Sequence, residues 1–267
     1  LKDSEFLFNL FGYISFRSGL SLVTSFFIVL VFMPYWIRLQ RNIFPSGQPI
    51  RNDGPDTHYQ KRGTPTFGGV LILFSIILSS ILWTSNFSNF NYILILTLIL
   101  FGIIGFFDDF QKVKFGNGIS TKTKFLYQLL ATLIIYIIIK YNGFDLNKFS
   151  IPFLKNASIE LGYFYFVLIL LIVIGSTNAT NLTDGLDGLV SMPLIFVFLT
   201  FAIFAYVLGN INFSNYLLVN YINGSGEIVI FCTSAIGALL GFLWFNSSPA
   251  SISVSYTHLT LPTIVSV

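Results

Sequence analysis

The sequence predicts an all-α fold, a polytopic bundle of transmembrane helices. Hydrophobic residues make up 54% of the 267 residues and charged residues only 9%, and the mean hydropathy of +0.79 lies above the range of soluble globular domains. The apolar runs approach the ~20 residues that a helical span needs and lack the alternation of barrel strands, so they indicate helices. The single cysteine excludes a disulfide framework. The mild net charge of +3 gives no reason to expect a nucleic-acid partner.

Seven apolar runs predict the helices of the bundle. The predicted spans are 19–37, 67–84, 90–107, 124–141, 162–178, 189–208 and 227–245. Residues 1–17 predict an amphipathic lead rather than a cleaved signal peptide, because no small-residue cleavage site follows a short apolar core. The segment 142–160, with its Gly, Asn and Pro residues, predicts a hairpin-like excursion. In the last span, Gly237 and Gly241 form a G-x-x-x-G motif that predicts close helix packing.

The distribution of basic residues predicts the orientation of these spans. With the N-terminus outside, the inner loops and their edges hold nine Lys and Arg residues and the outer segments hold five, which favours this orientation. The inner face also collects six aspartates. These are Asp53, Asp56, Asp108, Asp109, Asp184 and Asp187. Loops that only set the membrane topology need few acidic residues, so we expect the functional site to lie at this face.

The first inner-face cluster is a basic loop, residues 54–69, which is rich in Gly and Pro and leads into the second span. Lys61 and Arg62 supply positive charge, while Thr66 and the glycines offer hydroxyl and backbone N–H donors near a helix N-terminus. This combination suits an anionic ligand. A positive-inside anchor with turn residues explains the same composition.

The second cluster places Asp108 and Asp109 at the inner end of the third predicted span. Acids at a helix C-terminus oppose the helix dipole and adjacent carboxylates repel each other, which favours a functional reason for the pair. On a helix they diverge by about 100°, so we expect one to act as a base and the other to orient a cation. Lys112 follows at i+4 and i+3. Lys122 and Lys124, at the start of the next span, suit either phosphate or anionic lipid.

The third cluster is a polar stripe at three-residue intervals, formed by Asn178, Asn181, Asp184 and Asp187. In an α-helix such a stripe slants by about 60° a step, whereas a 3₁₀ winding would place it on one face. Amides and carboxylates suit a nucleotide or a hard cation, although a hydrogen-bond network between helices is the alternative. Carboxylates, amides and lysines at one membrane face together indicate a phosphorylated substrate with Mg²⁺.

These motifs closely resemble the phospho-N-acetylmuramoyl-pentapeptide transferases, or translocase I, of the polyprenyl-phosphate N-acetylhexosamine-1-phosphate transferase superfamily. The matching segments are 61–69, 102–109 with Lys112, 178–188, and 237–246 followed by Pro249 and Ala250. They occur in the order and spacing of the family and cover roughly residues 15–252. About seven spans are expected here, against roughly ten in the family.

The resemblance implies a peptidoglycan-synthesis enzyme of the bacterial inner membrane, with its active face toward the cytoplasm. It would transfer phospho-MurNAc-pentapeptide from its UDP carrier to undecaprenyl phosphate, giving lipid I and UMP with Mg²⁺ as cofactor. Catalysis would rest on positioning and charge neutralisation. Homodimers are common in the family and are expected here.

The resemblance also assigns roles to individual residues. Asp108 would deprotonate the lipid phosphate, or in an older view act as a nucleophile, and Asp109 would lie beside the diphosphate and the metal. Asn181 would be a second metal ligand, by analogy with sister enzymes of the superfamily. Lys61 and Asp187 would hold the uracil side, and Thr66, Asn181 and Asp184 the ribose and diphosphate side. Lys112 and Lys124 would contact phosphate oxygens, and Asn246 would border the pocket. Asn178 is also expected among the substrate-binding residues.

The resemblance stops after Ile252. Tyr256 stands where the family has a metal-binding aspartate, and the sequence then runs on to Val267 without a family match. We therefore expect residues 1–252 to form an incomplete transferase domain and residues 253–267 to lie outside the family fold. A chain of this length is expected to be inactive.

Two other functions fit parts of the pattern. A sister transferase that moves GlcNAc-1-phosphate shares the superfamily motifs, but the K-x-G-T-P-T loop and the L-T-D-G-L-D-G motif argue against it. A transporter or channel would also place acids in a membrane protein. It predicts acids spread through the membrane depth, whereas here they gather at one face.

Overall fold

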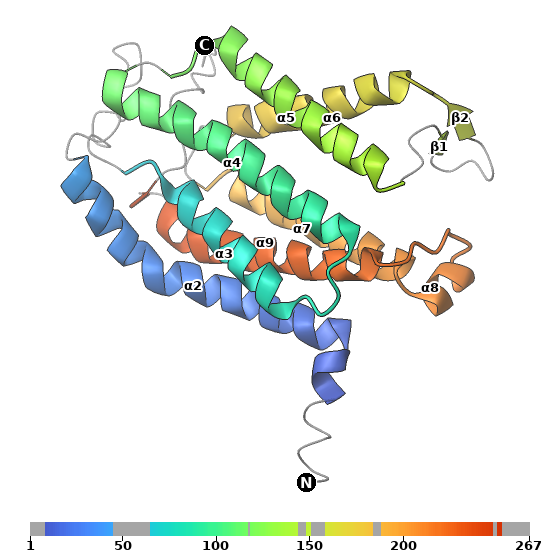
Figure 1. Cartoon of the computed structure of the whole chain (residues 1–267). Coiled ribbons are helices and arrows are strands. Elements are labelled where there is room, and N and C mark those ends of the chain that lie inside the picture. The colour runs from blue at the N-terminus through green and yellow to red at the C-terminus, as the bar shows by residue number, and fades with distance from the viewer. Residues whose placement is uncertain are drawn as a thin grey trace, which may run out of the picture.

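The computed structural model describes residues 9–44, 65–116, 118–143, 148–150, 158–183, 188–247 and 250–252. Within these residues the chain forms a bundle of helices that run side by side (Figure 1). The long helices are α2 (Ile14–Ile43), α3 (Gly68–Trp83), α4 (Asn89–Phe115), α5 (Thr121–Tyr141), α6 (Phe164–Thr183), α7 (Ser191–Leu208) and α9 (Ile228–Asn246), and the short ones are η1 (Leu10–Gly12), α8 (Ile211–Tyr216) and η3 (Ser225–Glu227).

This architecture confirms the predicted all-α membrane fold. Each of the seven predicted spans coincides with one long helix, and six helices of the described chain are long and apolar enough to cross a membrane. The seventh, α3, has only 16 residues. The prediction missed the short helix α8 and began the first span too late, because α2 starts at Ile14. Residues 1–8 of the predicted amphipathic lead lie outside the described residues.

A small hairpin joins α5 to α6. Strand β1 (Lys148–Ser150) pairs antiparallel with β2 (Ser158–Glu160), with Phe149 opposite Ile159. This confirms the hairpin-like excursion predicted for residues 142–160. In Figure 1 the hairpin and α8 lie at one end of the bundle, and the C-terminal end of α4 lies at the other. The acidic motif of α4 is therefore far from the hairpin.

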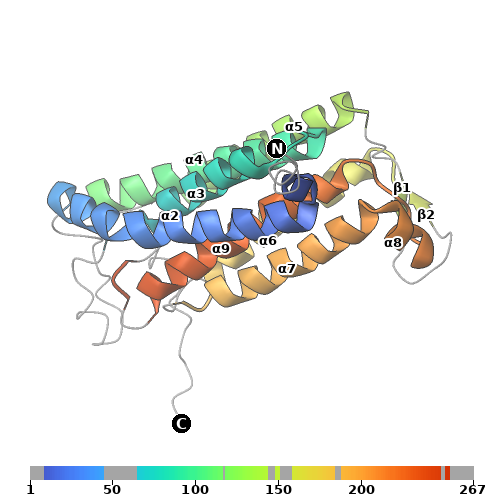
Figure 2. The same cartoon turned by 90° about the horizontal axis from the view of Figure 1, so that it is seen from below.

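Helix α9 forms the centre of the packing between α2 and α7 (Figures 1 and 2). A Cβ atom on Gly237 would collide with the Leu22 carbonyl oxygen, and one on Gly241 would lie 2.9 Å from the Phe26 carbonyl oxygen. The two helix backbones therefore approach closely because both positions lack a side chain. This confirms the packing predicted from the G-x-x-x-G motif.

Buried serines add hydrogen bonds between these packed helices. The hydroxyls of Ser21 on α2 and Ser79 on α3 lie 3.1 Å apart, and those of Ser80 on α3 and Ser234 on α9 lie 2.9 Å apart. Lipid tails are as apolar as the side chains between helices, so close packing and polar contacts of small residues contribute much of the association in a membrane. The sequence prediction did not identify these serines.

A buried ion pair lies at the N-terminal end of α2. The Arg17 guanidinium contacts both carboxylate oxygens of Glu227 at 2.8 and 2.7 Å and also donates to the Trp83 carbonyl oxygen at 3.0 Å. Arg17 is 5% exposed and Glu227 is 7% exposed. Arg17 is one of the five basic residues that the predicted topology places in the outer segments. The structure shows that its charge is also paired inside the bundle, by a bidentate contact with the Glu227 carboxylate.

Helix α4 continues well past the predicted end at residue 107. It ends at Phe115, where Gly116 adopts a left-handed conformation (φ 80°) and its N–H donates to the Lys112 carbonyl oxygen at 3.0 Å. The last turn therefore carries Lys112 and Lys114, which suit the negative end of the helix dipole. The expectation that the two acids end the helix was wrong, since the helix continues for about two more turns beyond them.

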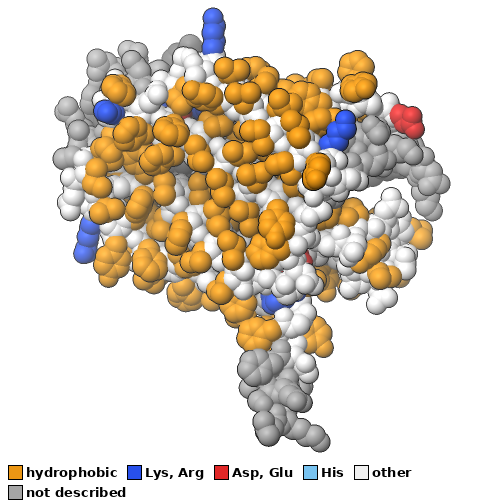
Figure 3. All heavy atoms as spheres, in the orientation of Figure 1, with side chains coloured by type: hydrophobic (Ala, Val, Ile, Leu, Met, Phe, Trp, Pro, Cys, Tyr) orange, Lys and Arg blue, Asp and Glu red, His pale blue; other side chains and the backbone are white. Residues whose placement is uncertain are grey.

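The surface of the bundle is strongly apolar. Figure 3 shows hydrophobic side chains spread over most of one face, with scattered basic groups near its edges. Large exposed side chains on α4 and α5 include Phe107, Leu130 and Ile134. A surface of this kind is stable in contact with lipid tails but not with water. This agrees with the membrane lipid contact that the composition predicts.

Candidate functional site

Two carboxylates and two lysines meet where α4 and α5 are joined, and we name them the acid–lysine cluster. The Asp108 carboxylate receives Lys112 Nζ at 2.9 Å and Lys124 Nζ at 3.2 Å on one oxygen, and the Ile119 N–H at 3.0 Å on the other. Lys112 Nζ also lies 3.0 Å from Asp109 Oδ1. The structure thus brings together four of the residues that the sequence assigned to the site.

Local sequence explains how this cluster forms. Lys112 reaches both acids because i+3 and i+4 neighbours share a helix face. Lys124 returns to the cluster because Ser120 caps α5, accepting the Thr123 N–H at 3.3 Å. The turn passes very close to the acids at Gly118, where a Cβ atom would lie 2.7 Å from Asp108 Oδ1. Only glycine fits there without moving the carboxylate.

The two acids have different surroundings, as the helical angle between them predicts. Asp108 is 3% exposed, and its three N–H donors stabilise the ionised carboxylate. The side chain of Asp109 is 15% exposed and lines a larger cavity in the bundle. One acid is therefore held within the cluster while the other faces space that a ligand can enter.

Two cavities adjoin the cluster. The smaller, about 120 Å³ and called the acid cavity here, lies among α4, α5 and α6 and is lined by Asp108, Asp109 and Lys124. The larger, about 320 Å³ and called the inner cavity, lies among α3, α4, α6, α7 and α9. Asp109 and Asn181 line both cavities. A ligand in the inner cavity would therefore reach the acid–lysine cluster past these two side chains.

The polar stripe continues α6 as an α-helix through Thr183, which excludes the 3₁₀ alternative for residues 178–183. Asn178 Nδ2 donates to Gln128 Oε1 at 3.0 Å, and Gln128 Nε2 donates to Asn178 Oδ1 at 3.5 Å. This amide pair links α5 to α6 one turn from Lys124 and from Asn181. Asn178 therefore contacts the neighbouring helix, while Asn181 faces the cavities.

Gln128 is a site residue that the sequence analysis did not predict. Its side chain is 1% exposed, lines the acid cavity and holds Asn178. A signal was present, because Gln128 follows Lys124 at i+4 on an otherwise apolar helix. Thr177 and Thr180 were also missed, although they flank the stripe and line the inner cavity.

The structure places Asn246 and Thr66 differently from the other predicted residues. Asn246 Oδ1 accepts the Gly188 N–H at 2.8 Å, and its Nδ2 donates to the Ile252 carbonyl oxygen at 2.9 Å. Its amide therefore connects the end of α9 to two neighbouring segments. Thr66 is buried immediately before Phe67, whose side chain lines the inner cavity.

Three predicted site residues, Lys61, Asp184 and Asp187, lie outside the described residues, as does the segment 253–267. In the part of the chain that the structure describes, no three His, Cys, Asp or Glu side chains come together at a spacing suited to a metal ion.

Comparisons with known proteins identify the family of this chain. Residues 91–254 match the family described as Glycosyl transferase family 4. The chain is 44% identical over 252 residues to the phospho-N-acetylmuramoyl-pentapeptide-transferase of Rickettsia prowazekii (strain Madrid E), and 43% identical over 254 residues to that of Rickettsia felis (strain ATCC VR-1525 / URRWXCal2). Both alignments cover 93% of this chain and 70% of the relative. The chain belongs to the phospho-N-acetylmuramoyl-pentapeptide transferase family.

Proposed function

We propose that the site serves transfer of phospho-MurNAc-pentapeptide from UDP-MurNAc-pentapeptide to undecaprenyl phosphate, at the cytoplasmic face of the bacterial inner membrane. The products are lipid I and UMP. The observation that carries the proposal is the acid–lysine cluster, in which a buried carboxylate contacts two ammonium groups beside a cavity. Lysines suit phosphate oxygens, and positioning with charge neutralisation is what phosphoryl transfer requires.

The reaction assigns separate tasks to the cluster. Asp108 takes the proton of the lipid phosphate, whose oxygen attacks the phosphorus that carries the sugar. A new P–O bond forms, the bridging P–O bond of the donor diphosphate breaks, and UMP leaves with the bridging oxygen. Lys112 and Lys124 can exchange their carboxylate contacts for phosphate oxygens and so neutralise charge in the transition state.

We propose Mg²⁺ as the cofactor, held by Asp109 and Asn181. Both side chains offer oxygen donors, which hard cations prefer, and both line the acid cavity and the inner cavity. The residues present therefore fit such an ion. Bound there, Mg²⁺ would neutralise the donor diphosphate.

The proposal is tested by two measurements on the purified chain in nanodiscs, namely donor binding and UMP release with undecaprenyl phosphate. We expect binding of UDP-MurNAc-pentapeptide in preference to UDP-GlcNAc. The opposite preference would favour the sister transferase, and binding of neither donor would refute the proposal. Donor binding without UMP release would support the proposed donor and contradict turnover by this chain.

In a chain that catalyses the transfer, Asp108→Asn is expected to abolish UMP release, because an amide cannot take the proton of the lipid phosphate. Donor affinity should change little, since Asp108 faces the lysines rather than the inner cavity. Glu160→Gln is the matched control, as this exposed acid lies in the hairpin at the other end of the bundle. Turnover by the Asn variant would remove Asp108 from the mechanism.

We also propose, from the family membership, that the protein works as a homodimer and that its transferase domain comprises residues 1–252. Native mass spectrometry in detergent tests the first point, since a monomer at all concentrations would contradict it. Deleting residues 253–267 tests the second, because donor affinity should stay the same.

A further inference from the structure

Three side chains at the C-terminal end of α2 hold the turn that begins α3. Trp36, Gln40 and the C-cap residue Phe44 follow each other at four-residue intervals, so they share one side of the helix. Trp36 Nε1 donates to the Phe67 carbonyl oxygen at 2.9 Å, and Gln40 Oε1 accepts the Phe67 N–H at 3.4 Å. The rings of Phe44 and Phe67 lie 5.6 Å apart. We name these three residues of α2 the Phe67 clamp.

Phe67, the residue that the clamp holds, forms part of the wall of the inner cavity. Its side chain is buried and lines that cavity together with Phe106 and Asp109. The rings of Phe67 and Phe106 lie 5.5 Å apart, and Phe106 precedes Asp109 by three residues on the same side of α4. The clamp therefore reaches, through Phe67, the part of the wall that carries the carboxylate proposed to hold Mg²⁺.

Helix α9 packs against the next residue of the same turn. A Cβ atom on Gly68 would lie 2.8 Å from Phe242 Cε2 and 3.4 Å from Ile252 Cδ1. Phe242 also lines the inner cavity. The start of α3 is therefore in contact with both α2 and α9. The contact with α9 is apolar, whereas the contact with α2 supplies directional hydrogen bonds that fix the orientation of Phe67.

Gln40 carries a polar group that the stability of the bundle does not explain. Its side chain is 4% exposed, and no group of the described residues accepts a hydrogen bond from its Nε2. A buried donor without an acceptor destabilises a protein, and an apolar side chain of similar length would avoid this loss. The oxygen that Gln40 offers to the Phe67 N–H gives a reason for an amide at this position.

We propose that Trp36 and Gln40 are positioning residues for the donor, because they fix Phe67 and with it the wall of the inner cavity against which the donor binds. The inference rests on the proposed function, which places the donor diphosphate beside Asp109. It adds that α2 determines how well the donor fits, although no described residue of α2 lines the inner cavity. Thr66, which is buried directly before Phe67, is positioned with it.

The test uses two variants of the purified full chain in nanodiscs, each of which removes one bond. Trp36→Phe keeps an aromatic ring without the N–H, and Gln40→Met keeps a long side chain without the oxygen. Each should weaken binding of UDP-MurNAc-pentapeptide by about fivefold, equivalent to ~1 kcal/mol. Trp83→Phe is the matched control, because Trp83 Nε1 donates to Thr24 Oγ1 at 3.0 Å and neither residue lines the inner cavity. Its donor affinity should equal that of the unchanged chain.

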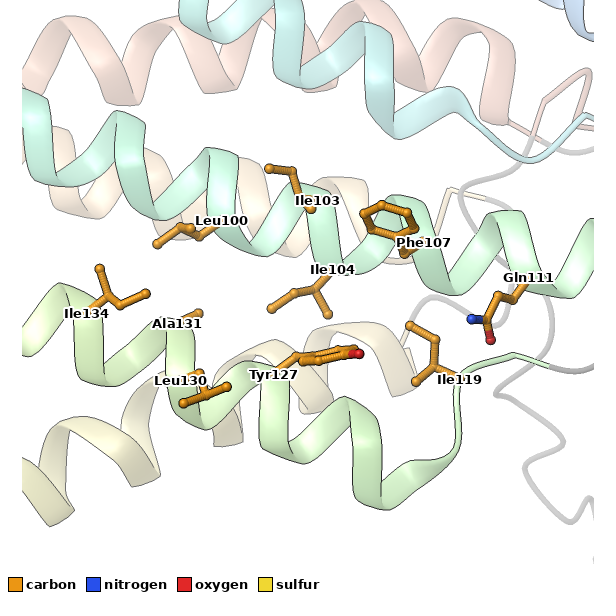
Figure 4. A pocket seen from close by; sticks show the side chains of 10 residues that line it. All are labelled: Leu100, Ile103, Ile104, Phe107, Gln111, Ile119, Tyr127, Leu130, Ala131 and Ile134. Atoms are coloured by element: carbon orange, nitrogen blue, oxygen red, sulfur yellow. The ribbon is translucent and has the colours of Figure 1, made fainter.

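Two further measurements separate positioning from a purely structural role. The unfolding temperature of Gln40→Met in detergent should stay nearly unchanged, because the variant removes the unpaired Nε2 donor together with the acceptor of the Phe67 N–H. The ¹⁹F chemical shift of 4-fluorophenylalanine in place of Phe67 should change in Gln40→Met, which alters no aromatic ring. The same label in place of Tyr127, which lies between α4 and α5 (Figure 4), should keep its shift.

The outcomes separate this inference from the proposed function. Donor affinity that stays the same in Trp36→Phe and Gln40→Met, or falls equally in Trp83→Phe, would overturn the inference and leave the proposed donor standing. A sharp fall in the unfolding temperature of Gln40→Met would make the clamp a stabilising contact and overturn it too. If the unchanged chain binds no UDP-sugar, the proposed donor is refuted. The ¹⁹F shift at position 67 then decides the inference, since a change supports a clamped cavity wall and a constant shift contradicts it.

Discussion

Gly118 controls how closely the α4–α5 turn approaches the catalytic carboxylate. A Cβ atom there would lie 2.7 Å from Asp108 Oδ1 and 3.0 Å from Lys112 Cε. Gly118→Ala should push the turn away and weaken the Ile119 N–H bond to Asp108. In a chain that catalyses the transfer we therefore expect kcat for UMP release to fall while donor affinity is kept. Gly175→Ala is the control, because nothing lies within 4 Å of the Cβ position there. Equal rates for the two variants would contradict a role for this close approach.

Gln128 is expected to position the polar stripe through Asn178. Gln128→Leu removes the partner of the half-buried Asn178 amide, which keeps only its hydrogen bond to the Ile174 carbonyl oxygen. This loss costs about 0.5–1.5 kcal/mol and should weaken both the thermal stability and the binding of donor with Mg²⁺. A double-mutant cycle with Asn178→Leu measures the coupling. Thr132→Val is the control, since its hydroxyl donates only to the local Gln128 carbonyl oxygen in α5. Strictly additive losses would show that the amide pair does not act as a unit.

At the scale of single residues, the sequence predicted contacts that depend on local geometry. Lys112 meets both acids because their spacing is a property of any α-helix. The pair of Gln128 and Asn178 joins residues 50 positions apart, and only the packing of α5 against α6 brings them together. The same limit applies to Asn246, because its side-chain hydrogen bonds depend on where the segments around Gly188 and Ile252 lie.

At the scale of elements, helix existence was predictable and helix ends were less so. Apolar runs identified all seven long helices of the described residues. A helix in lipid satisfies its backbone polar groups internally, so a long apolar run is a reliable signal for one. The extra turns of α4 beyond Asp109 include Gln111, Lys112 and Lys114, which lower the local hydropathy, so hydropathy did not detect them. They are helical because Lys112 pairs with the acids and Gly116 caps the end.

The contact of α2 with α9 gives a prediction at this scale. Gly237→Leu should force the two helices apart, since even a Cβ atom would collide with the Leu22 carbonyl oxygen, and overpacking costs about 1–3 kcal/mol or more. We expect a lower unfolding temperature in detergent. Gly19→Leu, on a face of α2 with open space, should leave that temperature nearly unchanged. If both variants unfold at the same temperature, the close packing is not what stabilises this pair.

At the scale of the whole molecule, the two ends of the bundle hold charges in different ways. One end holds the acid–lysine cluster beside cavities, and the other holds the buried pair of Arg17 and Glu227. Sequence reasoning identified the first end, where acids and lysines gather in motifs. The second joins residues 210 positions apart and carries no local signal.

The buried pair is expected to stabilise the bundle rather than to take part in transfer. Arg17→Met leaves the Glu227 carboxylate buried and unpaired, which costs about 3–5 kcal/mol, so the unfolding temperature in detergent should fall sharply. Adding Glu227→Leu removes the unpaired charge and should recover much of that loss. Donor affinity of the double variant should match the unchanged chain, because the pair lies at the end of the bundle opposite Asp109. A double variant as unstable as Arg17→Met would mean that lost packing, and not the buried charge, causes the effect.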